Sequence, residues 1–206
     1  MPLQNRVTPF GDIVAVANRG LFTGNRGILH DPETRTIKRA WTSKRWLVCL
    51  CEFKGRKRSL MAPGRWTELF FLDEATALAA GHRPCFECRR TDAKAFQSAW
   101  ARGNGAALPS ADTMDAILHA ERLSGRTKRL HATDRRLTEM PDGAMIAAGQ
   151  DSFVVIAGSV RRWTPSGYVA SGAAPTSTWL LTPPSTERAL AAGYGPRLHP
   201  SAFAVT

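Results

Sequence analysis

Short β-prone runs, separated by Gly, Pro and Asn, dominate the first part of the chain. Such runs are typical of strands joined by tight turns. They cover residues 13–17, 36–38, 45–53, 59–61 and 66–72. We therefore expect an antiparallel β meander in this part of the chain.

A second, smaller β region is expected toward the other end of the chain. Gly158 and Ser159 lie between two apolar runs and indicate the turn of a hairpin. The β-prone runs of this region cover residues 143–147, 152–157, 160–164 and 178–181.

Three helices are expected between the two β regions. Asp73 is a suitable N-cap for a helix that ends at Gly81, because glycine readily adopts the left-handed conformation that follows a helix. Apolar residues three and four apart predict further helices over residues 92–102 and 111–123. The basic segment 124–136 is expected to be a loop or a frayed helix.

The combined pattern predicts an α+β protein, in one compact domain with two lobes, 1–104 and 105–206. The sequence A-L-A-A-G-x-x-P of residues 77–84 recurs without cysteines at residues 189–196, where Ser185 is the expected helix-capping residue. The repeat indicates one of two things. Either a unit was duplicated, or both segments share a common arrangement in which a strand is followed by a helix that ends at a glycine. In both cases we expect similar local geometry.

One glycine-rich segment resembles a phosphate-binding loop only superficially. Residues 20–27 lack the Gly-Lys-Ser/Thr ending of a P-loop and precede a β pattern rather than a helix. We expect a flexible turn there.

Charge changes this picture by indicating a partner. The 206 residues include 28 Lys and Arg against 17 Asp and Glu, a formal charge of +11. Such an excess favours polyanions, so we expect DNA as the partner, with RNA left open. No apolar run approaches the roughly 20 residues that span a bilayer, so no membrane partner is expected. Four cysteines in two tight pairs fit a reducing cytoplasm better than a disulfide framework.

The cysteines also predict a metal site. Cys85 and Cys88 have the spacing at which two thiolates converge on one zinc ion. Cys49 and Cys51 lie on an expected strand, where their Cα atoms would be about 6.6 Å apart, whereas sulfurs on one zinc lie within about 4 Å of each other. Three arrangements stay open: both ligate if the strand bends, one ligates together with a histidine, or both are small buried hydrophobes.

Residues 69–88, which run from an apolar strand through "EATALAAG" to "RPCFEC", resemble the zinc-binding domain of the Ada family. That resemblance implies that Cys85 and Cys88 are zinc ligands and that the protein binds damaged DNA. The family places its earlier cysteines three residues apart on a loop, unlike Cys49 and Cys51, so we do not expect direct methyl transfer here. The resemblance covers about a tenth of the chain.

A second constellation, His119-Ala120-Glu121 with Pro84-Cys85-x-x-Cys88, is similar to the motifs of zinc deaminases in reversed order. On a helix over 111–123, His119 and Glu121 would point about 200° apart. They could therefore share a zinc only if the helix began near His119.

The same helix provides candidate catalytic residues. Glu121 falls in the apolar stripe of Ile117 and Leu118, where burial would raise the pKa of its carboxyl and suit it to acid–base chemistry. The alternative is a structural ion pair with an arginine. Asp115 lies one turn before His119 and could orient it, or the two could form a surface pair.

Cations interleaved with aromatic residues predict a nucleic-acid surface, because arginines hold phosphates while aromatic rings stack on bases. The candidates are Arg45, Arg56, Lys57, Arg58, Arg65, Arg89, Arg90, Arg161, Arg162, Trp163 and Tyr168.

These patterns together predict a zinc-stabilised DNA-binding protein of DNA repair or modified-base processing. The first hypothesis is a hydrolase of the DNA glycosylase type, with Glu121 positioning or activating water. The alternatives are a non-catalytic DNA- or RNA-binding sensor or regulator, and a zinc-dependent nucleobase deaminase.

Overall fold

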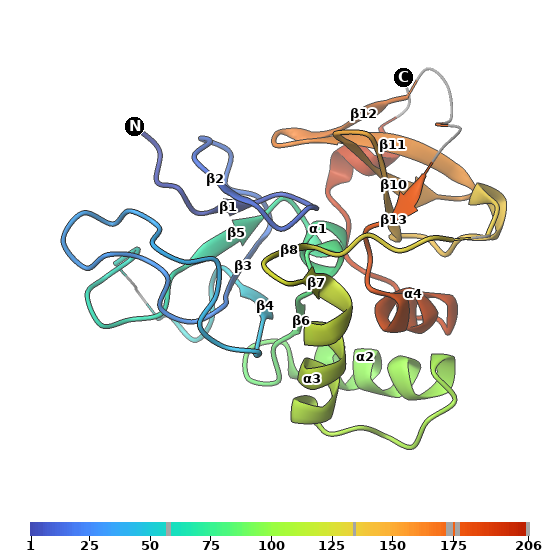
Figure 1. Ribbon diagram of the computed structural model, residues 1–206, viewed down its shortest axis with the longest axis horizontal. Coiled ribbons are helices and arrows are strands. Elements are labelled where there is room, and N and C mark those ends of the chain that lie inside the picture. Colours follow the sequence, from blue (N-terminus) through green and yellow to red (C-terminus); the bar gives the residue numbers. More distant parts are fainter. Residues whose placement is uncertain (57–58, 134, 172–174, 176–177, 205–206) are drawn as a thin grey trace.

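The computed structural model describes residues 1–56, 59–133, 135–171, 175 and 178–204. Within these residues the chain is an α+β protein with two main sheets and four α-helices. The predicted class is confirmed. Figure 1 shows the short helix α1 (Glu74–Ala79) at the centre, between the two sheets, with α2, α3 and α4 grouped along one side.

The first sheet has six short strands in the order β2-β1-β5-β3-β4-β6. The pairs β1–β5 and β4–β6 are parallel and the other three are antiparallel, so the sheet is mixed rather than a simple meander. Its strands are β1 (Arg6–Val7), β2 (Ile13–Val14), β3 (Phe22–Asn25), β4 (Leu47–Leu50), β5 (Leu69–Phe71) and β6 (Arg83–Pro84).

Two of the predicted strands do not form. Residues 36–38 contribute only an isolated bridge between Ile37 and His30, and residues 59–61 lie in a turn where Met61 has a positive φ of 52°.

The segment 20–27 contains a strand, so the expected flexible turn is wrong. Residues 22–25 form β3, which lies between β4 and β5. A Cβ atom at Gly24 would lie 2.0 Å from the Leu47 carbonyl oxygen and 2.9 Å from the Phe71 ring. The glycine therefore serves close packing inside the sheet rather than chain reversal.

Helix α1 has the predicted ends. The Asp73 carboxylate accepts hydrogen bonds from the Thr76 amide at 2.9 Å and the Thr76 hydroxyl at 2.8 Å. Gly81 follows the helix with a φ of 90°, and a Cβ atom there would lie 2.6 Å from the Arg122 side chain. All six residues of the helix are buried, so α1 lies inside the protein.

The second sheet is antiparallel throughout, in the order β12-β11-β10-β9-β13. Ala157 and Gly158, with φ values of 47° and 70°, form the two-residue turn between β10 and β11. Its strands are β9 (Met145–Ala148), β10 (Asp151–Ile156), β11 (Ser159–Thr164), β12 (Gly167–Ala170) and β13 (Trp179–Leu180).

The remaining helices are α2 (Arg90–Gly103), α3 (Ala111–Arg122) and α4 (Pro184–Ala191). Helices α2 and α4 approach closely, since a Cβ atom at Gly103 would lie 2.1 Å from the Arg188 carbonyl oxygen. The segment after α3 contains a small hairpin, β7 (Leu123–Ser124) with β8 (Thr127–Lys128), and two 3₁₀ turns follow at Leu137–Glu139 and Pro200–Phe203. Every helix in the described part of the chain is too short or too polar to cross a lipid bilayer.

The two A-L-A-A-G copies end in the same hydrogen bonds. After α1 the Gly81 and His82 amides donate to the carbonyls of Leu78 and Ala77, both at 2.9 Å. After α4 the Gly193 and Tyr194 amides donate to the equivalent carbonyls at 2.9 and 3.1 Å. This Schellman-type ending follows from the glycine that both copies share.

A buried carboxylate connects the two copies. Glu74 in α1 forms an ion pair with Arg89, at 2.8 Å between each carboxylate oxygen and a guanidinium nitrogen. It also accepts from the Tyr194 hydroxyl at 2.6 Å and the Arg197 amide at 3.0 Å. Burial lowers the pKa of Arg89, but the hydrogen bond and charge of Glu74 outweigh it and hold that pKa above its usual value.

We expect Glu74→Gln to lower the free energy of unfolding by about 3 kcal/mol or more, because it leaves the Arg89 charge buried without its counter-ion. Urea unfolding measures the change. Glu139→Gln is the control, since its exposed ion pair with Arg136 should contribute less than about 1 kcal/mol. Equal effects of the two substitutions would contradict this role of Glu74.

Candidate metal centre

Three cysteine thiols converge at the edge of the first sheet. The Sγ atoms of Cys49, Cys85 and Cys88 all lie within 4.8 Å of one another. Cys49 lies on β4 and Cys85 directly follows β6, the parallel neighbour of β4. The register pairs Val48 with Pro84, and the Cys85 amide donates to the Val48 carbonyl at 3.0 Å. Strand pairing therefore brings these two cysteines together across 36 residues of sequence.

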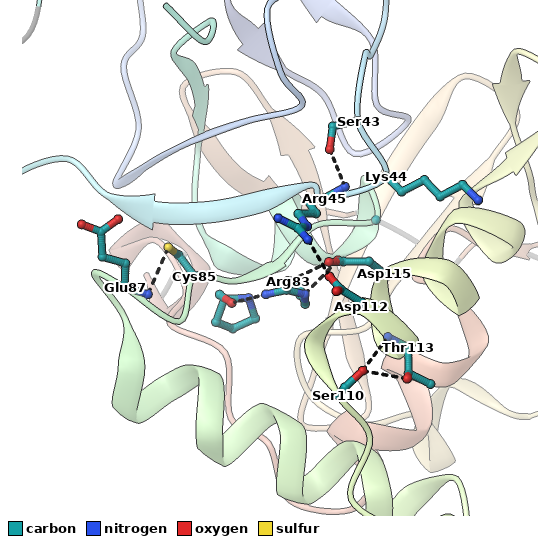
Figure 2. A network of polar contacts seen from close by, with 12 residues as sticks. Ser43, Lys44, Arg45, Arg83, Cys85, Glu87, Ser110, Asp112, Thr113 and Asp115 are labelled. Atoms are coloured by element: carbon teal, nitrogen blue, oxygen red, sulfur yellow. Dashed lines mark hydrogen bonds and ion pairs between the residues drawn. The ribbon is translucent and has the colours of Figure 1, made fainter.

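A tight turn supplies the third thiol. The Arg89 amide donates to the Cys85 carbonyl at 3.0 Å, and the Glu87 amide approaches the Cys85 sulfur at 3.4 Å. Figure 2 shows this contact beside the first turn of α2. Helix α2 begins at Arg90, so Cys88 lies next to a helix N-terminus, whose partial positive charge favours a thiolate.

The thiols influence one another electrostatically. Hydrogen bonds from the Cys49 and Cys88 thiols, with the Cys88 and Glu87 amides, lower the pKa of Cys85 well below the usual thiol value. The pKa of Cys49 is raised in turn, by its hydrogen bonds to Cys85 and Cys88 and by burial. One thiolate is thus already favoured in the cluster, and a cation could replace the remaining thiol protons.

Cys51 is separate from this cluster. Its thiol lies 3.6 Å from the Leu21 carbonyl oxygen, and within the described residues the group of possible metal ligands contains only the three other cysteines. Of Cys49 and Cys51, only Cys49 therefore belongs to the thiol cluster. This agrees with the expectation that two cysteines two residues apart on a regular strand are too far apart to bind one zinc ion together. The structure adds no histidine to the group.

The donor set fits a metal ion. Three thiols are soft ligands of the kind that zinc, copper(I) and iron–sulfur clusters take. All three also line a cavity of about 830 Å³, together with Cys51, Glu52 and Glu87. A fourth ligand would reach a bound ion from this cavity.

An ion pair next to the cluster fixes the chain just before Cys85. The Arg83 guanidinium donates two hydrogen bonds to Asp115 of α3, at 2.8 and 2.7 Å, and both side chains are buried (Figure 2). Burial raises the pKa of Asp115, against the opposing effect of Arg83. Asp115, a candidate catalytic residue, thus connects α3 to the turn that contains Cys85 and Cys88, which we call the knuckle. The sequence contains no signal for this pairing, because the two residues lie 32 positions apart and only the tertiary structure brings them together.

The other two candidate catalytic residues lie elsewhere. The Glu121 carboxylate accepts from the Ser185 amide at 3.1 and 3.2 Å and from its hydroxyl at 2.6 Å. His119 accepts from Arg122 at 2.9 Å and contacts Trp41 edge-on at 4.7 Å between ring centroids. Within the described residues, no hydrogen bond or ion pair joins His119, Glu121 and Asp115 to one another. His119 also lies outside the group of possible metal ligands, whereas a deaminase would need it there.

Glu121 instead completes the first turn of α4. Pro183 occupies the N-cap position without a capping side chain, and Pro184 has no amide proton, so Ser185 carries the first free amide of the helix. Ser185 is thus not the N-cap that its position in the repeat suggested. A carboxylate from α3 takes the capping role.

The predicted nucleic-acid residues divide into surface and interior. Arg45, Arg65, Arg90 and Arg162 are exposed and Arg161 is half-buried, whereas Lys57 and Arg58 lie outside the described residues. Arg56, also exposed, forms a 2.8 Å ion pair with Glu87 at the cysteine cavity.

Three members of the predicted surface point inward instead. Arg89 is buried in the Glu74 ion pair, and Tyr168 is 5% exposed in the core beneath the second sheet. The Trp163 indole donates to the Thr76 hydroxyl at 3.1 Å, which directs it toward α1. Neither Arg89 nor Tyr168 is therefore available to a nucleic acid at the surface, because both side chains are buried inside the protein.

We expect Cys49→Ser to abolish most metal binding and Cys51→Ser to retain it, because only the first removes a clustered thiol. Metal content per chain, measured by mass spectrometry of purified protein, tests this matched pair. Equal metal content in the two variants would contradict the three-cysteine site.

We expect Glu121→Ala to lower the free energy of unfolding by about 1–2 kcal/mol, the usual effect of losing a helix cap. Glu121→Gln should recover most of this loss, since its amide oxygen can still accept from Ser185. Denaturant unfolding measures both variants. Wild-type stability in Glu121→Ala would show that the carboxylate has no capping role.

Comparison of the chain with protein-family models, with curated proteins and with solved structures gives no match. The resemblance of residues 69–88 to the Ada zinc-binding domain therefore stays an expectation drawn from the motif. The chemistry of the site follows from the three thiols themselves.

Proposed function

We propose that the chain is a zinc-stabilised DNA-binding protein of DNA repair or modified-base processing. The observation that carries this proposal is the cluster of Cys49, Cys85 and Cys88, whose sulfurs lie within 4.8 Å of one another. Sulfurs bound to one zinc at about 2.3 Å lie roughly 4 Å apart. Zinc thus needs only small side-chain movements here.

The zinc would act as a structural link. It would join β4 to the turn before α2, and so fix the start of that helix against the first sheet.

The cavity beside the cluster also leaves room for a water molecule. Hydrolytic zinc sites keep an open coordination position for water, and the cavity offers that space. The described carboxylates on this cavity wall are Glu52, Glu68 and Glu87.

The surface charge supports a nucleic-acid partner. The net charge of +11 steers the protein toward polyanions, and exposed arginines lie around both sheets. Arg56 and Glu87 pair at the rim of the cysteine cavity, where a phosphate could compete for the arginine. The Ada-like motif adds damaged DNA as the expected form of that partner.

A glycosylase-type activity that depends on Glu121 is the less supported version of this proposal. The hydrogen bonds of Glu121 to Ser185 favour the non-catalytic version, because they give the carboxylate a structural role as the cap of α4. Turnover assays on duplexes with modified bases separate the versions. Lost turnover in Glu121→Gln, with DNA binding and stability kept, would support the hydrolase.

We expect the zinc-loaded protein to bind DNA with a strong salt dependence. Replacing Arg161 and Arg162 together by Ala should weaken binding and reduce the slope of log affinity against log salt by about 0.9 for each lost phosphate contact. Fluorescence anisotropy with labelled single-stranded DNA, duplex DNA and RNA measures both quantities and compares the partners.

Arg136→Ala is the control, because that arginine carries the same charge, is highly exposed and lies outside the predicted set. Metal content is measured on the same preparations. Purification without stoichiometric zinc, or no binding to any nucleic acid at low salt, would contradict the proposal.

A further inference from the structure

A second cavity, of about 480 Å³, lies apart from the cysteines. Its wall comes from the N-terminal segment, the segment 37–41, the end of α1 and the β7–β8 hairpin. Among the described residues, six basic side chains and one carboxylate, Asp12, line it. The basic residues are Arg26, Lys38, Arg39, Arg122, Arg126 and Lys128.

Two of these cations are buried. Arg26 and Arg122 are each 1% exposed, and each guanidinium carbon lies 3.9 Å from the centroid of a Trp46 ring. Arg26 donates to the Gly11 carbonyl at 2.8 Å, and Arg122 donates to the Gly81 carbonyl at 3.0 Å. Arg26 also donates to His82 Nε2, and Arg122 donates to the Lys44 carbonyl and to His119 Nδ1. The partners of the two guanidinium groups are therefore an aromatic ring, carbonyl oxygens and imidazole nitrogens.

Neither guanidinium has a full set of partners. The Arg26 Nη2 and Arg122 Nε atoms are buried and have no hydrogen-bond acceptor within the described part of the chain. Among the residues that the structure describes, no carboxylate lies within ion-pair distance of Arg26, Arg122 or Lys128. A buried charge without a counter-ion is costly, so this arrangement favours an anion as the missing partner.

Two carboxylates act on these arginines from beyond ion-pair distance. The charge of Asp12 raises the pKa of Arg26 and that of Asp115 raises the pKa of Arg122, but burial outweighs both effects. Lys128 donates to the Ala79 carbonyl, and burial, with the charges of Arg26 and Arg122, lowers its pKa to about 7. The Arg26 Nε–H group donates to His82 Nε2 at 3.2 Å, and burial with the same two charges lowers the pKa of His82 well below its usual value. Arginines with several free donors match the oxygens of a phosphate group.

We propose that this cavity binds the phosphate group of a nucleotide, with the phosphate near Arg26, Arg122 and Arg126 and the base against Trp41. Trp41 lines the cavity and is only half-buried, so part of its ring is open to a base. The volume lies in the range of small-molecule sites. The choice of a nucleotide among phosphate compounds rests on the proposed nucleic-acid function.

The nucleotide has two possible sources, a free nucleotide or an unpaired nucleotide of a strand. Titrations of the zinc-loaded protein with inorganic phosphate, deoxyadenosine monophosphate and a 5′-phosphorylated single-stranded oligonucleotide compare them. The fluorescence of Trp41 and Trp46 and the melting temperature provide two readouts. All three probes should raise the melting temperature, because each binds only the folded protein.

The exposed rim supplies variants that keep the fold. Arg39→Ala and Arg126→Ala should each weaken binding of the mononucleotide about tenfold, a size that fits the loss of one charged hydrogen bond. Arg129→Ala is the matched control, because this exposed arginine lies just beyond the same hairpin and does not line the cavity. Trp41→Ala should weaken binding of the mononucleotide but not of inorganic phosphate.

Arg26→Met tests the buried charge. It should remove the stabilisation by phosphate, and it should raise the melting temperature of the free protein because an unpaired buried charge is gone. If this variant does not fold, the rim variants still decide the question.

The outcomes separate this proposal from the proposed function. No binding of phosphate or mononucleotide, or unchanged binding in Arg39→Ala and Arg126→Ala, would overturn the cavity proposal even if the protein binds DNA elsewhere. Binding of the mononucleotide without any binding of DNA or RNA would support the cavity site and overturn the nucleic-acid function.

Discussion

The fold depends on one buried ion pair, between Glu74 at the start of α1 and Arg89 before α2. The carboxylate also holds the Tyr194 hydroxyl and the Arg197 amide, so three distant parts of the chain meet at one side chain. A buried ion pair is strongly destabilised when one of its partners is removed, because the other charge is then left in the low-dielectric interior without a counter-ion. This constraint fixes the knuckle, the C-terminal segment and α1 relative to one another.

Both candidate sites depend on the short segment that follows α1. In this segment the Gly81 carbonyl accepts a hydrogen bond from the buried Arg122. Arg83 forms the ion pair with Asp115, and Cys85 is the first cysteine of the segment in the thiol cluster. Along β4, Cys49 joins that cluster, while Trp46, just before the strand, lies beside the guanidinium groups of the second cavity. Two sites of different chemistry are therefore supported by the same pair of parallel strands.

Local signals in the sequence were sufficient for several elements. Asp73 and Gly81 mark the ends of α1, and the spacing of apolar residues places α2 and α3 close to their observed ranges. The same kind of reasoning failed at residues 20–27, because a glycine that allows close strand packing looks like a glycine that allows a turn. It also failed at Ser185, because the capping carboxylate comes from Glu121, 64 residues away.

The sequence by itself determined the basic character of the chain, the α+β class, the two ends of α1 and the close spacing of Cys85 and Cys88, because composition and short-range spacing carry that information. Only the tertiary structure decided that Cys49 rather than Cys51 completes the thiol cluster, since the register of β4 against β6 makes that choice. It alone brought Arg26 and Arg122 together around Trp46. Contacts between residues far apart in the chain produce no periodic pattern in the sequence. The burial of those residues in the folded protein then determines their pKa values and the partners that they can bind.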